Sequence, residues 1–214
     1  MAEQKSISLS TAESAATSVR VAAIRGDSVV LTYSSLPGND PGSYGNFVAV
    51  WEDAVIPYSK PPLQKISIQG NARRGSVAVG NLKPETSEYI FGYAVGPQVA
   101  DVCSYAYIDP NDPSREFSAA LIILVVTPDT VALRYSFPSG FDPAQNGASV
   151  ALWRGATGSY RQPPIAQKAI TANASTGDVA MSNVQILFGE TYTAALLASR
   201  SRTSLAAWVT FTIG

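Results

Sequence analysis

Histidine is absent from the 214-residue chain, and cysteine occurs once, at Cys103. Histidine is the usual acid or base near neutral pH and the commonest transition-metal ligand. Its absence excludes Ser-His-Asp and Cys-His triads and, with one cysteine, ordinary zinc sites. An intrachain disulfide is excluded as well. We therefore expect no cofactor and no metal, and any catalysis would rest on carboxylates, tyrosines or lysines.

Charge and long apolar runs are scarce as well. Charged residues make up 14 % of the chain, 15 basic against 16 acidic, for a net charge of −1. Because there is no basic stripe, we expect no nucleic-acid binding. The longest apolar run, Ala119–Val126, is far too short to cross a bilayer, so we expect no membrane span. Low charge makes self-association easier, which makes a homo-oligomer an expectation.

The first residues, MAEQKSISLS, contain no apolar stretch of the kind that a cleavable signal peptide needs. A single cysteine also fits a reducing compartment. We therefore expect a cytoplasmic location, or export by a route that needs no cleavable N-terminal signal.

What the chain does contain is a repeat of itself. Of the 61 positions from Val21 to Asn81, 23 carry the same residue 102 positions later. A period of this size predicts an internal duplication of one domain rather than a solenoid of short units. Each copy has about 100 residues, a common domain size and enough to bury a core.

Short β-type runs, separated by Gly, Pro and Asn turn signals, fill both copies. About seven runs per copy, spaced roughly 8–12 residues apart, are typical of a β-sandwich. No segment shows a sustained helical period with caps. The fold class is therefore predicted to be all-β, with two tandem immunoglobulin-like sandwich domains.

The domain boundaries follow from the repeat. Residues 1–17 are predicted to be an N-terminal arm, or an extra edge strand. Residues 18–108 are the first sandwich and residues 118–214 the second. Residues 109–117 are proline-rich and are predicted to be a short junction that holds the two domains close together.

A local motif supports the sandwich. Within Asn81–Tyr89, leucine, proline, threonine and tyrosine come in the order L-x-P-x-T-x-Y with one extra residue, just before the apolar run Ile90–Val95. This segment resembles fibronectin type III domains, and Gly189–Tyr192 is a looser form of it. The resemblance implies a tyrosine whose hydroxyl folds back onto the backbone, the tyrosine corner. Such sandwiches host many unrelated functions, so the resemblance indicates fold alone.

Several aromatic residues recur in both copies. Tyr33 and Tyr135 lie on the expected second strand of each copy, and Trp51 and Trp153 lie on the expected third. Because large aromatic residues on these strands usually fill a sandwich core, we interpret all four as core residues.

Tyr58 and Tyr160 differ from these, because each comes shortly before a diproline in an expected loop. Loops carry function more often than cores do. We therefore take Tyr58 and Tyr160 as candidate ligand-binding residues that could stack on a partner. A shared turn geometry would also explain their repetition.

The polar candidates are Asp40, Asp142, Glu52 and Arg154. Each aspartate precedes a proline and would either bind a ligand or cap a turn. Glu52 and Arg154 follow the repeated tryptophans and differ between the copies, which favours a site specialised in one copy. Glu52 and Asp53 are neighbours on the chain and would point to opposite faces of a strand, which argues against a paired-carboxylate hydrolase.

These observations favour a non-catalytic two-domain protein that binds a protein or glycan partner through loops and exposed aromatic residues. A histidine-free enzyme, of the cyclase or isomerase type, is a second hypothesis; it would use carboxylates and tyrosines in a cleft between the domains. A third hypothesis is a subunit of a structural assembly or toxin complex, because sheet edges invite self-association.

Overall fold

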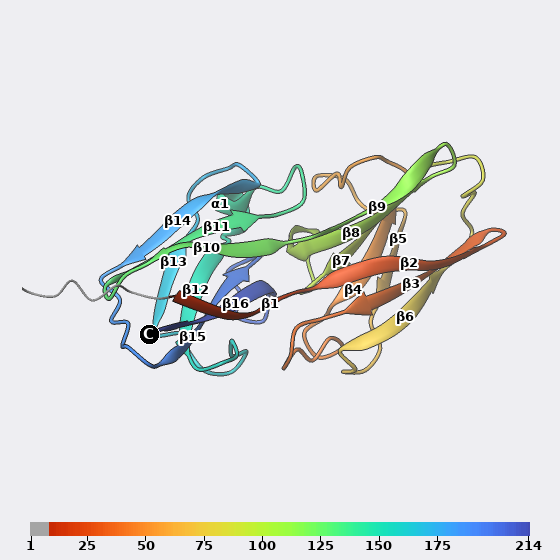
Figure 1. Cartoon of the computed structure of the whole chain (residues 1–214). Helices are drawn as coiled ribbons and strands as arrows, with labels where there is room; N and C mark the ends of the chain where they lie inside the picture. The colour runs from red at the N-terminus through yellow and green to blue at the C-terminus, as the bar shows by residue number, and fades with distance from the viewer. Residues whose placement is uncertain (1–8) are drawn as a thin grey trace, which may run out of the picture.

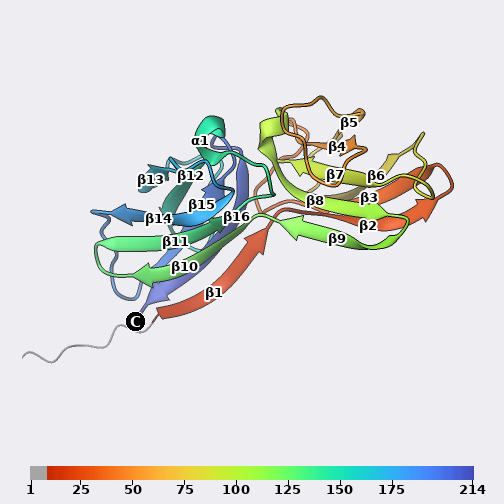
Figure 2. The same cartoon turned by 90° about the horizontal axis from the view of Figure 1, so that it is seen from above.

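The computed structural model describes residues 9–214, which form two β-sandwich domains side by side (Figures 1 and 2). Each sandwich has one three-stranded and one five-stranded sheet, with only antiparallel pairing between the described strands. The predicted all-β class with two immunoglobulin-like sandwich domains is confirmed. Within the described residues, no helix is long and apolar enough to cross a membrane.

The first domain consists of a three-stranded sheet in the order β2-β3-β6 and a five-stranded sheet in the order β5-β4-β7-β8-β9. Its elements are β2 (Ser18–Arg25), β3 (Ser28–Ser34), β4 (Phe47–Trp51), β5 (Gln64–Ser67), β6 (Arg74–Val79), β7 (Tyr89–Ala94), the 3-10 helix η1 (Val99–Asp101), β8 (Val102–Asp109) and β9 (Asp112–Ser118).

The second domain consists of a three-stranded sheet in the order β10-β11-β14 and a five-stranded sheet in the order β13-β12-β15-β16-β1. Its elements are β1 (Leu9–Ala16), β10 (Ala120–Val126), β11 (Thr130–Ser136), α1 (Pro143–Asn146), β12 (Ser149–Arg154), β13 (Ala166–Ala169), β14 (Thr176–Ser182), β15 (Thr191–Leu197) and β16 (Leu205–Ile213).

Residues 102 apart occupy equivalent places in the two domains. The hydroxyl of Tyr33 donates to the carbonyl of Ala72 (3.3 Å), and that of Tyr135 donates to the carbonyl of Ala174 (3.2 Å). Both rings are buried in the sandwich core, as predicted. Both hydroxyls lie against a glycine on the neighbouring strand, where a Cβ atom would come within 2.6 Å of the oxygen. A side chain at the glycine position would clash with the tyrosine, so each tyrosine requires its glycine and the two repeat together.

In each five-stranded sheet, one of the two outer strands comes from the segment that leads into the other domain. β9 immediately precedes the second domain but pairs with β8 of the first domain. β1 immediately precedes the first domain but pairs with β16 of the second. The strands β1 and β9 thus play equivalent parts in the two domains. Both segments run from one domain to the other in Figure 1.

The chain crosses between the domains at two single residues, Thr17 and Ala119. The amide of Thr17, between β1 and β2, donates to the carbonyl of Ala206 at 2.9 Å. The amide of Ala119, between β9 and β10, donates to the carbonyl of Cys103 at 2.9 Å. Both crossing residues are fully buried. At each one the chain leaves the five-stranded sheet of one domain and enters the three-stranded sheet of the other.

These pairings place a strand in each of the segments 1–17 and 109–117. The described part of the segment 1–17, from Leu9 onward, is the edge strand β1, which agrees with the second alternative given above. The segment 109–117 holds a two-residue turn at Pro110 and Asn111 followed by most of β9. Backbone groups at the edge of a sheet are stabilised by pairing, so both segments pair with a neighbouring strand.

Trp51 and Trp153 are buried, at 3 % and 4 % exposure, but not between the sheets. Along β4, Val48 and Val50 point into the sandwich and Trp51 points to the opposite face. The Tyr–diproline loops cover that face: the indole N–H of Trp51 donates to the carbonyl of Lys60 at 3.3 Å, and that of Trp153 to the carbonyl of Gln162 at 3.1 Å. The tryptophans thus belong to a second apolar layer outside each five-stranded sheet.

Both domains contain the tyrosine corner that the sequence resemblance implied. The hydroxyl of Tyr89 accepts a hydrogen bond from the amide of Lys83 at 3.1 Å. The hydroxyl of Tyr192 accepts one from the amide of Leu187 at 3.0 Å. Each bond ties the loop before the strand to the strand itself.

We expect Tyr89→Phe to lower the free energy of unfolding by about 1–3 kcal/mol, because the amide of Lys83 loses its partner. Urea denaturation followed by tyrosine and tryptophan fluorescence measures the change. Tyr105→Phe is the matched control, since no hydrogen bond of its hydroxyl is seen among the described residues, and it should change stability by less. Equal losses in the two variants would contradict the structural role of the corner.

Candidate binding groove

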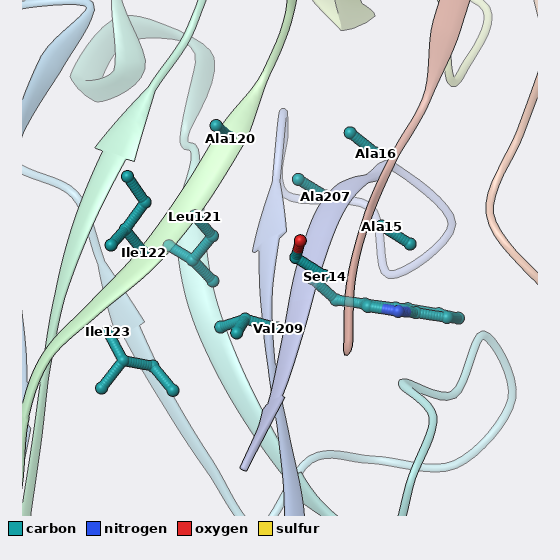
Figure 3. A pocket seen from close by; sticks show the side chains of 10 residues that line it. Ser14, Ala15, Ala16, Ala120, Leu121, Ile122, Ile123, Ala207 and Val209 are labelled. Carbon is teal, nitrogen blue, oxygen red and sulfur yellow. The ribbon is translucent and has the colours of Figure 1, made fainter. Parts of the chain in front are cut away.

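An apolar groove opens between the two sheets of the second domain (Figure 3). It has a volume of about 550 Å³. One wall is β1, the other is β10, and β16 contributes the remaining side chains. The residues that line it are Ser14, Ala15, Ala16, Ala120, Leu121, Ile122, Ile123, Ala207, Trp208 and Val209.

The groove offers apolar side chains and two unpaired strand edges. None of the described residues that line it is charged. The two walls are the outer strands of their sheets, since β1 pairs with β16 and β10 with β11. Both therefore present backbone N–H and C=O groups that a further strand could pair with.

β10 also exposes large apolar side chains to solvent. Ile122 is 56 % exposed, Leu124 40 % and Val125 52 %. A strand edge with this composition is unusual, because soluble proteins normally protect their edges with charge, proline or a covering segment. We regard β10 and the adjoining groove as one surface.

The first domain carries an exposed ion pair at the equivalent place. Arg20 on β2 and Glu116 on β9 occupy the positions of Ile122 and Ser14, 102 residues away, and their side chains approach to 3.4 Å. Neither Ile122 nor Ser14 can form such a pair. The same framework is therefore bridged by charge in one domain and open and apolar in the other.

The outer face of β1 differs from that of β9 as well. Ala15 stands opposite Trp208 on β16, whereas the equivalent Phe117 of β9 stands opposite Tyr105 and stacks on it with ring centroids 5.5 Å apart. Trp208 and Ala15 belong to the apolar layer outside the sheet, so alanine in place of phenylalanine leaves that layer less covered beside the groove.

The two candidate tyrosines of the diproline loops contact the opposite domain. Tyr58 lies edge-on to Phe141 of the second domain with centroids 5.4 Å apart, and its hydroxyl donates to the carbonyl of Val102 at 3.0 Å. Tyr160 stacks on Tyr44 of the first domain at 5.5 Å and is buried. The structure thus gives both rings a reciprocal packing role between the domains, and ligand binding by either stays a prediction.

A buried polar network surrounds Tyr160. Its hydroxyl accepts a hydrogen bond from the side-chain amide of Asn39 at 3.3 Å. The side-chain amide of Asn46 donates to Asn39 and to the hydroxyl of Tyr93, both at 3.0 Å. Burial raises the pKa of both phenols above the ordinary value of 10, and the amide contacts lower it by less. Burial therefore favours the neutral form of both tyrosines.

Asp142 and Asp40 lie in equivalent loops, but their carboxylates have different partners. The carboxylate of Asp142 accepts the amide of Gln145 at 2.9 Å and caps α1, which is the turn-capping alternative. The carboxylate of Asp40 lies 3.8 Å from the guanidinium of Arg161, across the boundary between the domains. Asp40 also lines an open hollow of about 380 Å³ with Tyr160 and Arg161.

Glu52 and Arg154 are exposed at the ends of β4 and β12. They line none of the hollows described for this structure. Of the six candidate positions, the structure brings Asp40 and Tyr160 together and leaves the other four apart from them. A ligand role for Glu52 and Arg154 stays a prediction.

The carboxylates do not gather in a deep cleft. Asp101, which is buried, accepts the amide of Gln98 at 2.9 Å and lies against Gly96. Asp40 is partly exposed and next to a cation. Among residues 9–214 there is no group of three or more His, Cys, Asp or Glu side chains that could hold a metal ion.

Comparison with known proteins adds little beyond the fold. No protein-family model matches the chain, and no curated protein matches it either. Among solved structures, it is similar to the two tandem V-type regions of VCBP3, a V-region-containing chitin-binding protein. That match has 13 % sequence identity and a TM-score of 0.30, and it covers 93 % of this chain and 99 % of the other.

The groove residues were missed at the sequence level although a signal was present. Arg20 and Ile122 are aligned by the repeat, one residue before the stretch in which identities were counted. An apolar residue that replaces a charged one on an equivalent edge strand indicates a difference in surface. β1, however, pairs with residues about 200 positions away, and local patterns do not predict such pairing.

We expect the contribution of Tyr93 and Tyr160 to stability to be constant up to about pH 10 and to be lost above it. Because the folded-state pKa values of Tyr93 and Tyr160 are raised, the unfolded chain loses these protons first and is favoured as the pH rises. Urea unfolding between pH 8 and pH 12 measures this loss. Tyr160→Phe removes one ionisation, so its stability should fall less steeply over the same range, although it starts lower. Identical slopes for the two proteins would contradict this assignment.

Proposed function

We propose that the protein is a non-catalytic two-domain binding protein and that its partner is another protein, held along β10 and the groove of the second domain. The observation that carries the proposal is the difference between the domains. One edge carries the pair Arg20–Glu116, and the equivalent edge carries Ile122 and Ser14 beside an open groove.

The chemistry of the groove favours an extended apolar segment. Free backbone groups on two edge strands suit a partner that adds a β-strand, and the apolar side chains suit alternate apolar residues on it. The absence of charge among the described lining residues gives no basis for recognising a phosphate or a carboxylate. A protein strand satisfies both the backbone and the side-chain requirements.

A glycan partner has less support. Sugar-binding surfaces usually expose aromatic faces, and the repeated rings Tyr58 and Tyr160 pack between the domains instead. The enzyme hypothesis has less support for a similar reason, since the candidate carboxylate Asp40 lies in an open hollow beside Arg161.

We also propose that the two domains arose by duplication of one domain with a fibronectin type III-like corner. The shared strand order, the two tyrosine corners and the reciprocal outer strands support this origin. After duplication, one edge would have kept or gained charge and the other would have become the binding surface.

The test uses a labelled synthetic peptide of about eight residues that alternates valine and threonine, with lysine at both ends. Fluorescence anisotropy should show saturable binding at one site per chain. The double substitution Ser14→Glu with Ile122→Arg introduces the charges of the first domain and should weaken binding at least about tenfold, equivalent to about 1.4 kcal/mol.

The matched control is Arg20→Ile with Glu116→Ser, which introduces the groove chemistry into the first domain. It should leave the original site intact and add a second one. Unchanged binding by the charged variant would overturn the groove as the site. So would a glycan that binds the intact chain and is unaffected by either double substitution.

A further inference from the structure

The two outer strands are tethered to their domains in different ways. β9 is joined to its partner β8 by the two-residue turn Pro110–Asn111. β1 is joined to the second domain only through the body of the first domain, by way of Thr17 and β2. Chain connectivity therefore holds β9 in its own sheet, whereas non-covalent contacts alone hold β1 against β16.

Side chains anchor the two strands unequally as well. On β9, Phe117 stacks on Tyr105, Arg115 lies 4.3 Å from the centre of the Tyr107 ring, and Glu116 pairs with Arg20. On β1, the equivalents of Glu116 and Phe117 are Ser14 and Ala15.

Small side chains contribute little apolar burial, so the Ser14–Ala16 part of β1 relies mainly on its backbone ladder with β16. The hydroxyl of Thr210 adds a bond of 3.2 Å to the carbonyl of Glu13. Ala16 and Ala15 also pack against the core clusters, so an exchange of β1 must restore these contacts in the partner.

The segment 118–120, which links β9 of the first domain to β10 of the second, consists of small residues, as hinges often do. Ser118, Ala119 and Ala120 are small, and β9 ends and β10 begins on either side of Ala119. The hydrogen bond from the Ala119 amide to the carbonyl of Cys103 is the contact that an opening at this point would break.

We propose that the chain forms an exchanged homodimer, in which the first domain of one molecule packs on the second domain of another. Strand β1 of each molecule completes the sheet of its partner beside β16, and residues 118–120 of each molecule extend as the hinge. The contacts between domains, including the stacking of Tyr160 on Tyr44 and of Tyr58 against Phe141, are reproduced between molecules.

The equilibrium between the closed monomer and the exchanged dimer depends on the few contacts that differ between them. Because the domain contacts are the same in both forms, the difference in free energy comes from the hinge and from the cost of bringing two chains together. A directly linked partner domain has an effective concentration in the millimolar range. The closed monomer should therefore dominate in dilute solution, and the dimer fraction should rise with protein concentration.

The experiment mixes two full-length variants, one carrying Ser14→Cys and the other Ile122→Cys, at high concentration. Both positions line the open groove, so a short thiol-specific cross-linker can reach them. A covalent heterodimer forms if β1 of one chain lies beside β10 of the other. The product should increase with concentration and with incubation time before cross-linking.

Two controls make the result decisive. The double variant Ser14→Cys with Ile122→Cys on one chain should link within the monomer when dilute, which shows that the pair is reactive. The mixed pair Glu116→Cys and Arg20→Cys occupies the equivalent positions of the first domain, where the turn after β8 keeps β9 in place, so it should give no heterodimer.

A heterodimer from the groove pair alone supports the exchange. If the double variant links efficiently but the mixed groove pair gives no heterodimer at any concentration, the proposal is overturned. Equal products from the two mixed pairs would also overturn it, because they would indicate contact between molecules without strand exchange. Neither outcome bears on the peptide binding described above.

Discussion

The arrangement of the two domains depends on the pairing of their outer strands. Each five-stranded sheet ends in a strand that belongs, by sequence, to the entrance of the other domain. The backbone before each crossing residue therefore pairs with one domain, and the backbone after it pairs with the other. The amides of the crossing residues Thr17 and Ala119 are themselves hydrogen-bonded. A linker of the ordinary kind leaves the angle between domains free, but two crossing strands on the same boundary fix it. The packing of the Tyr–diproline loops against the opposite domain follows from this constraint.

The same constraint produces the difference between the two surfaces. β1 and β9 play equivalent parts in the fold, yet β9 carries glutamate and phenylalanine where β1 carries serine and alanine. Because the backbone ladder satisfies the sheet edge in both cases, the side chains at these positions are free to vary. In the first domain Glu116 pairs with Arg20 across the space between the sheets, and in the second Ser14 lines an open groove beside an apolar edge. The groove thus lies beside a strand whose place is set by hydrogen bonds and whose side chain at this position forms no ion pair.

What the sequence predicted well was local. Tyr89 was placed correctly because its hydrogen bond reaches back only six residues, to Lys83, and Asp142 was one turn from the amide it caps. Tyr33 and Tyr135 were assigned to the core because strand position and residue size agree. Trp51 was expected in the sandwich core and lies outside the sheets, because alternation after Val48 and Val50 directs it to the opposite face. It is buried there because the loop to Lys60 folds over it. An edge strand before the first domain was one of the alternatives, but its pairing with the second domain could not be predicted, because the carbonyl of Glu13 meets Thr210 across 197 positions of sequence.

Stability alone does not account for the apolar edge of the second domain. An exposed ion pair such as Arg20–Glu116 contributes about 0–1 kcal/mol, so its loss from the equivalent edge would cost the fold little. Placing Ile122, Leu124 and Val125 on a strand edge, however, gives little packing energy from the parts of these side chains that stay exposed, and it makes unwanted strand pairing easier. The first domain shows that the same framework folds with arginine and alanine at equivalent positions. The apolar edge of β10 is unfavourable when uncovered and is not needed for folding, so we infer that another segment covers it. The free backbone groups on both walls of the groove indicate that this segment is extended.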